Sequence, residues 1–116
     1  MRYILMSNID RSALGALPPA DLQATMGRFV AFTQALAESG VLRGAEQLQP
    51  ADTATTVRVR DGALLLTDGP YADVVESFGG FWIVEAPDLD TVLKYAEDCP
   101  ATTLGSVEVR SLVELG

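Results

Sequence analysis

The chain has 116 residues, of which 48% are hydrophobic and 21% charged, so it fits one compact domain over residues 1–116 and excludes a disordered chain. A net charge of −8, without any Lys/Arg cluster, argues against direct binding to nucleic acid or to an anionic membrane, whose phosphates an acidic surface repels. With no histidine and one cysteine, the sequence excludes a histidine base, histidine metal ligands and an internal disulfide. We therefore expect no metal, no cofactor and a cytoplasmic location, where a free thiol stays reduced.

The N-terminal third predicts a strand, a loop and a long helix. Residues 2–7 are β-rich and apolar and predict an opening strand; without a small-residue cleavage site after a long apolar core, the N-terminus is not interpreted as a signal peptide. Residues 8–19 contain turn formers and predict a loop. Over residues 20–39 the spacing predicts a helix that Gly40 ends, with an apolar stripe of Leu22, Met26, Phe29 and Leu36, flanked by Phe32.

The central third predicts a hairpin. Residues 46–49 suit a short strand, and then TTVRVR and ALLLTD flank Asp61-Gly62, a two-residue connection typical of hairpins. This spacing places Arg60 opposite Ala63. Strand alternation then predicts one covered apolar face that also carries Asp68 at its rim, with Val57, Val59, Leu64 and Leu66 as its members.

The C-terminal third predicts a strand, a helix and a closing strand. Residues 81–86 are apolar on both faces, as in a central strand. A helix follows with Asp88 as its N-cap, its end at Pro100 and a buried stripe of Leu89, Val92, Leu93 and Ala96. Residues 107–113 alternate as a last strand. The order is βαββαβ-like with an extended central hairpin, and two helices cover only one sheet face, so we expect a homodimer that buries the other.

Several motifs carry a family resemblance that covers nearly the whole chain. In order and spacing the chain resembles the DGPF branch of the YCII-related proteins, through Leu48-Gln49-Pro50, Asp68-Gly69-Pro70, Gly79-Gly80-Phe81, Asp88-Leu89-Asp90, Cys99-Pro100 and Val107-Glu108-Val109-Arg110. This resemblance implies a ferredoxin-like α+β fold that dimerises through its sheets as a dimeric α+β barrel. Two departures stand out. Tyr71 occupies the place of the expected Phe, and the His–Asp pair suspected of acid–base catalysis in YCII relatives cannot carry over to a chain without histidine.

The candidate site centres on two carboxylates. Asp68 is held by a rigid turn, and Glu76 is a second carboxylate that could converge on it, since paired acids can divide into one protonated and one ionised group. We expect the ligand-binding residues to be Gly69, Pro70, Tyr71, Gly79 and Gly80. The alternatives are an ordinary turn for Asp68 to Tyr71 and a strand bend or bulge at the glycine pair.

Three functions stay open on the sequence, which does not decide whether the chain is an enzyme. The first is a small-molecule pocket with lyase- or isomerase-like chemistry based on Asp68. The second is a regulatory protein that binds an extracytoplasmic-function sigma factor, a partner that the resemblance implies. The third is a fold member with only a structural role. Cys99 lies on the predicted buried side of the second helix and is interpreted as a packed thiol.

Overall fold

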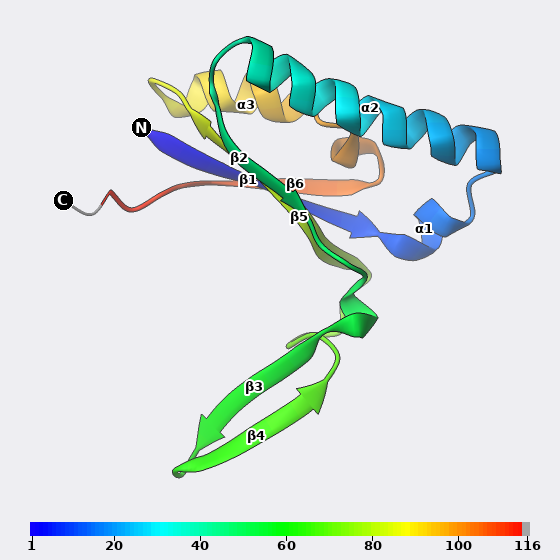
Figure 1. Cartoon of the computed structure of the whole chain (residues 1–116), viewed down its shortest axis with the longest axis vertical. Coiled ribbons are helices and arrows are strands. Elements are labelled where there is room, and N and C mark those ends of the chain that lie inside the picture. The colour runs from blue at the N-terminus through cyan, green and yellow to red at the C-terminus, as the bar shows by residue number, and fades with distance from the viewer. Residues whose placement is uncertain (115–116) are drawn as a thin grey trace.

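The computed structural model describes residues 1–114 and shows one four-stranded antiparallel sheet, helices over one of its faces, and a separate two-stranded hairpin (Figure 1). The elements in chain order are β1 (Arg2–Asp10), α1 (Arg11–Gly15), α2 (Pro19–Glu38), β2 (Leu42–Gln47), the 3₁₀ turn η1 (Ala51–Thr53), β3 (Thr55–Arg60), β4 (Ala63–Asp68), β5 (Glu76–Glu85), α3 (Leu89–Glu97), the 3₁₀ turn η2 (Pro100–Thr103) and β6 (Gly105–Ser111).

The sheet has the strand order β2-β5-β1-β6, and it confirms the predicted α+β class with a βαββαβ-like order. β5 pairs with β1 on one side and β2 on the other, as expected for a strand that is apolar on both faces. Leu5 of β1 lies opposite both Trp82 of β5 and Val109 of β6, so the centre of the sheet is fixed by cross-strand pairs of apolar side chains.

The hydrophobic core lies between the sheet and the helices. Alternate residues of β1 are buried, and Leu5, Val84 and Val92 have no exposed surface. Phe32 and Leu36 of α2 pack onto the strands, while Leu22, Met26 and Phe29 are only partly buried at the edge of the core. The predicted apolar stripe of α2 therefore faces the sheet, as expected, but its residues differ in how deeply they are buried.

Strand β1 departs from the sequence-based expectation at its C-terminal end. The strand continues to Asp10, and the predicted loop contains the short helix α1, because the Asp10 carboxylate accepts a hydrogen bond from the Ala13 amide (3.1 Å) and caps the first turn. The pairing of β1 with β5 has a β-bulge between Ser7 and Asn8, where Gly79 of β5 has no partner. On the other side of β1, β6 approaches so closely that a Cβ on Gly105 would lie 2.0 Å from the Asn8 carbonyl oxygen.

Helix α3 begins as predicted. The Asp88 carboxylate accepts hydrogen bonds from the Thr91 amide (2.9 Å) and hydroxyl (2.7 Å), which confirms Asp88 as the N-cap. Val92 and Ala96 are buried, but Leu89 and Leu93 remain 48% and 42% exposed, so the buried stripe is narrower than the sequence predicts.

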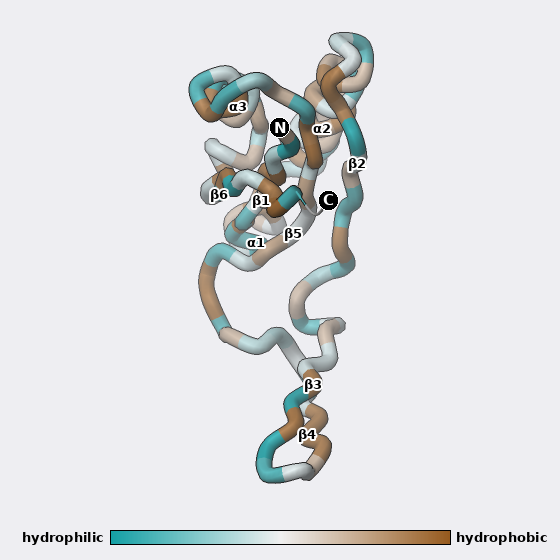
Figure 2. The backbone as a smooth tube through the Cα atoms, turned by 90° about the vertical axis from the view of Figure 1, so that its left-hand side faces the viewer, coloured by the Kyte–Doolittle hydropathy of each residue, from teal (hydrophilic) through white to brown (hydrophobic). Residues whose placement is uncertain are grey.

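The central segment differs most from expectation. Strand β2 begins at Leu42 and ends at Gln47, earlier than predicted, and the β3–β4 hairpin leaves the main sheet (Figures 1 and 2). Its register is as predicted, with Arg60 opposite Ala63 and positive φ angles of 53° and 77° at Asp61 and Gly62. The prediction that the apolar face of the hairpin is covered is wrong for the single chain, because Val57, Val59, Leu64 and Leu66 are each 60–64% exposed.

The face of the four-stranded sheet opposite α2 and α3 carries a central apolar patch. Ile4 pairs with Ile83, Met6 pairs with Phe81, and all four side chains are half-buried on this face. Polar side chains flank the patch on the edge strands, with Glu46 on β2 and the ion-paired Glu108 and Arg110 on β6. We call this surface the open face.

Candidate functional site

A cavity of about 480 Å³ lies beneath the middle of α2, where the helix crosses β1, β5 and β2. Apolar walls come from Ile9, Leu14, Met26, Phe29 and Trp82, and a smaller set of polar groups comes from Ser7, Arg11, Thr33, Gln34, Glu46 and Gln47. A largely apolar, concave site with a few polar groups is the usual form of a small-molecule site.

Trp82 forms the aromatic wall of the cavity. Its ring stacks on Phe29 at a centroid distance of 6.2 Å and meets the edge of Phe32 at 5.1 Å. The indole Nε1 donates a hydrogen bond to the Thr33 hydroxyl oxygen (2.9 Å), and Thr33 in turn donates to the Phe29 carbonyl (3.1 Å). These contacts fix the orientation of the ring, so the wall is formed before any ligand arrives.

Ser7 and the glycine pair form the floor. Ser7 is 2% exposed and donates its hydroxyl proton to the Gly80 carbonyl (3.1 Å), which leaves the hydroxyl lone pairs as acceptors toward the cavity. A Cβ on Gly80 would lie 2.9 Å from the Glu46 carbonyl oxygen, so glycine is required there for strands β2 and β5 to approach. At Gly79 the nearest atom to an added Cβ is 3.8 Å away, and the missing side chain leaves space in the cavity.

Arg11 is the cationic side chain that lines the cavity. The Arg11 guanidinium donates to the Leu48 carbonyl at 3.5 Å, and no carboxylate of the described residues lies within 4.0 Å of it. A half-buried guanidinium without a carboxylate partner favours a ligand that presents a carboxylate, a phenolate or another electron-rich oxygen to it.

The structure separates the predicted site residues into two groups. Gly79 and Gly80 line the cavity, whereas Asp68, Gly69, Pro70 and Tyr71 lie at the end of β4 and beyond, outside it. The predicted turn is well braced: Gly69 has φ 102°, its amide donates to the Ala54 carbonyl (2.6 Å), and its carbonyl accepts from the Thr56 hydroxyl (2.8 Å). Asp68 is exposed on the hairpin, and Tyr71 is 82% exposed.

Glu76 is likewise outside the cavity. It begins β5 opposite Asp10 of β1, and its carboxylate accepts a hydrogen bond from the Ser106 hydroxyl (2.8 Å). Both Asp68 and Glu76 are exposed in the single chain. Their predicted role as a converging pair therefore remains a proposal.

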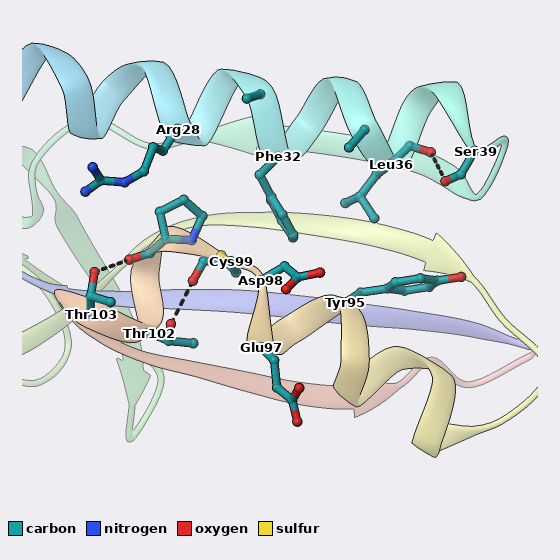
Figure 3. A pocket seen from close by; sticks show the side chains of 13 residues that line it. Arg28, Phe32, Leu36, Ser39, Tyr95, Glu97, Asp98, Cys99, Thr102 and Thr103 are labelled. Carbon is teal, nitrogen blue, oxygen red and sulfur yellow. Dashed lines mark hydrogen bonds between the residues drawn. The ribbon is translucent and has the colours of Figure 1, made fainter.

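A second cavity of about 640 Å³ lies between α2 and the α3–η2 segment (Figure 3). Phe32 and Leu36 reach into it from α2, and Tyr95 faces it from α3. Three of its hydroxyl groups are used within their own elements, because Ser39, Thr102 and Thr103 each donate to a carbonyl three residues earlier. Its other polar lining residues are Arg28, Tyr95, Glu97 and Asp98.

Cys99 borders this second cavity and is 1% exposed. Burial raises the pKa of its thiol to about 11, against a smaller lowering effect of the hydrogen bond from the Ala101 amide. A thiol with so high a pKa is a poor nucleophile near neutral pH. Among residues 1–114, no group of three His, Cys, Asp or Glu side chains is placed to hold a metal ion.

The model of the YCII-related domain matches residues 1–116 of the sequence. The chain belongs to the YCII-related family. It is 31% identical to the uncharacterized protein R00369 of Rhizobium meliloti (strain 1021), over 97% of this chain and 92% of that protein.

A solved structure extends the comparison to the fold. The chain is similar to 5-chloro-2-hydroxyhydroquinone dehydrochlorinase from Burkholderia phenoliruptrix AC1100, which was solved in complex with 2,5-dihydroxybenzoquinone. The match has a TM-score of 0.55 and 16% identity over 97% of this chain and 94% of that one. This YCII-related protein therefore has the α+β fold that its sequence predicts. In the part of the chain that the structure describes, no helix has the length and apolar character needed to cross a membrane.

Sequence reasoning missed most of the cavity wall. Ser7 is the polar member of an inward-facing row that also contains Tyr3, Leu5 and Ile9, and this interruption was the available signal. Trp82 belongs to the strand that the sequence predicts to be apolar on both faces, which gives it no particular role in a site. Its buried indole N–H needs an acceptor, which pointed to a polar group nearby but did not identify Thr33.

Proposed function

We propose that this YCII-related protein binds a small, planar, oxygen-bearing molecule in the cavity beneath α2. The observation that carries the proposal is the preformed aromatic wall of Trp82, which faces the space left by Gly79. A flat ring would stack against the apolar wall, while the Ser7 hydroxyl and the Arg11 guanidinium would receive its polar groups. The quinone bound by the dehydrochlorinase, a protein of similar fold, is a molecule of this chemical class.

The chemistry of the proposal is proton transfer of the lyase or isomerase type, with Asp68 as acid or base and Glu76 as the second carboxylate. In a single chain both lie outside the cavity, so this role requires a second copy or a movement of the hairpin to bring Asp68 to the cavity. The proposal therefore assigns binding and catalysis to different residues: the cavity residues bind the ligand, and the two carboxylates carry out any reaction.

Within the family, we place the chain in the DGPF branch on its Asp68-Gly69-Pro70 and Gly79-Gly80-Phe81 motifs. The proposed working form is a cytoplasmic homodimer. The apolar patch of the open face supports the dimer, since such a patch is usually covered by another copy. The free buried thiol of Cys99 suits a reducing compartment.

Trp82 is the only tryptophan in the sequence and lies in the cavity wall, so it reports binding directly. We expect 2,5-dihydroxybenzoquinone, used as the probe, to quench Trp82 fluorescence saturably, with agreement between quenching and calorimetric titration. Gly79→Val should weaken binding about tenfold or more, because its side chain enters the cavity. Leu65→Val on the distant hairpin is the matched control and should bind as the native protein does.

The same titration separates the alternatives. Saturable binding that Gly79→Val leaves unchanged would place the ligand elsewhere and overturn the proposed site. No binding by any of a panel of hydroxylated aromatic acids and quinones would favour the regulatory alternative, in which a sigma factor is the partner. Asp68→Asn should leave probe binding intact and abolish turnover of any substrate found; unchanged turnover would remove Asp68 from the mechanism.

A further inference from the structure

The β3–β4 hairpin, residues 55–68, is a candidate interaction surface that the ligand site does not use, and we call it the arm. It forms a two-stranded sheet of its own, and neither strand pairs with the main sheet. Two-stranded hairpins that stand alone are marginally stable in water, because each strand has only one neighbour and no layer covers it. The arm therefore needs another surface to be held in its observed form.

The exposed apolar side chains of the molecule gather on the arm and on the segment that returns from it. Among residues 1–114, 15 large hydrophobic side chains are exposed, and eight of these fall between residues 57 and 75. Val57, Val59, Leu64 and Leu66 share one face of the arm, through the pairs Val57–Leu66 and Val59–Leu64. Apolar surface concentrated in this way, rather than scattered, indicates an interaction site.

The direction of the arm identifies where its cover must come from. Figures 1 and 2 show the arm beyond the four-stranded sheet, on the side away from α2 and α3, and thus on the side of the open face. The chain has a radius of gyration of 16.2 Å. A compact chain of this length would have about 13 Å. The arm therefore extends away from the body into space that the chain itself does not fill.

A second copy of this chain fits that space. The open face offers an apolar centre with a polar rim, which is the usual anatomy of a protein interface. Two sheets that pack face to face lie about 10 Å apart, whereas six-residue strands span about 20 Å. An arm of that length passes the sheet of a copy seated on the open face and runs along its side.

Charge supports the same occupant. The arm and its turn carry Arg58, Arg60, Asp61 and Asp68 and so have no net charge, although the whole chain carries −8. An uncharged arm docks on an acidic copy without the repulsion that two acidic bodies would otherwise meet. A stable dimer interface needs about 800 Å² from each partner. Contact through both the arm and the open face adds the area of one surface to that of the other.

We propose that the arm is a clasp, which packs its apolar face of Val57, Val59, Leu64 and Leu66 against the body of a second copy of this chain. In a two-fold dimer each copy gives one arm and receives one, so the arrangement closes at two copies. The inference rests on the homodimer of the proposed function and deepens it, because it moves part of the interface from the sheet to the arm.

The test compares two faces of the same arm. Val59→Ser combined with Leu64→Ser removes a directly opposed pair from the apolar face, and Leu65→Ser removes an apolar side chain from the other face. Sedimentation equilibrium over a range of concentrations should show that the double variant raises the dimer dissociation constant about tenfold or more, whereas Leu65→Ser changes it less than about threefold. Trp82 fluorescence checks that the body stays folded, since this ring lies in the core.

A second measurement locates the contact. Hydrogen–deuterium exchange of residues 55–68 should be slow in the native dimer, fast on dilution to the monomer, and fast at every concentration in the double variant. A native dimer with unchanged affinity in the double variant would overturn the clasp and leave the open-face dimer standing. A native monomer would overturn both, and binding of 2,5-dihydroxybenzoquinone by that monomer would still support the ligand site.

Discussion

The body and the arm of this protein both contain strands rich in apolar residues, with opposite structural outcomes. In β1 the residues that face the helices, Tyr3 and Leu5 among them, are buried. In the arm, β3 alternates polar and apolar residues and β4 carries three consecutive leucines, yet every residue of β4 is exposed. An apolar strand face thus indicates that the face needs cover, but it does not identify whether that cover comes from the same chain.

The largest expected contrast comes from truncating one leucine in each region. Leu5 in β1 has no exposed surface and Leu66 in β4 is 64% exposed. Leu5→Ala should lower the free energy of unfolding by about 2–5 kcal/mol, because it leaves a cavity in the core. Leu66→Ala should lower it by less than about 1 kcal/mol when measured by urea denaturation at concentrations where the chain is monomeric.

Equal losses in the two variants under dilution would mean that the arm is packed within its own chain. A Leu66→Ala effect that grows with protein concentration would instead sharpen the contrast, since it would assign the contact to a second copy.

A smaller contrast concerns thiol reactivity. Burial raises the pKa of Cys99 to about 11, so its thiolate is scarce at pH 8. A cysteine placed on the arm by Leu65→Cys should have an ordinary pKa near 8.5 and react with Ellman's reagent at least about 100-fold faster. Two kinetic phases are expected in that variant, and the slow one should match the native protein. Fast reaction of the native protein would show that the core around Cys99 opens readily.

The smallest expected effect is a pH dependence in the body. Hydrogen bonds from the Thr91 hydroxyl and amide hold the pKa of Asp88 below its ordinary value of 3.8. Since the folded pKa is depressed, the stabilisation is present above the unfolded pKa and is lost as pH falls through the folded one. The Tm difference between the native protein and Asp88→Ala should therefore be full above about pH 5 and narrow below pH 3.8.

Asp88→Asn provides the control, because asparagine caps a helix without titrating. Its Tm difference from Asp88→Ala should stay constant across the same pH range. If the Tm difference between the native protein and Asp88→Ala does not become smaller at low pH, the charge of the Asp88 carboxylate contributes nothing to the cap.

The features that the sequence predicted are those set by local rules. Asp61-Gly62 fixes the hairpin register, the helical spacing fixes α2, and Asp88 fixes the start of α3. The candidate site depends on long-range packing. Ser7 meets Gly80 across 73 positions of sequence, and Trp82 meets Thr33 across 49, so neither contact could be derived from spacing.

The placement of Asp68 shows the same limit. Its strand face was predicted correctly from the register, because Asp68 lies opposite Thr55 at the end of the alternating pairs. Periodicity does not predict that the hairpin leaves the main sheet. That departure occurs at η1 and at the connection before β5. Gly79 and Gly80, which lie within β5 itself, line the cavity, and their expected role in ligand binding stays a prediction.

Gly105 lies opposite Ile9 in the pairing of β1 with β6, and any Cβ at this position would lie 2.0 Å from the Asn8 carbonyl oxygen. Glycine at this position is therefore a geometric requirement of the β1–β6 junction, independent of whatever ligand a relative binds. A search for distant members of the family can use it as a marker of the fold, because a chain with any larger residue there must hold its first and last strands further apart at this point.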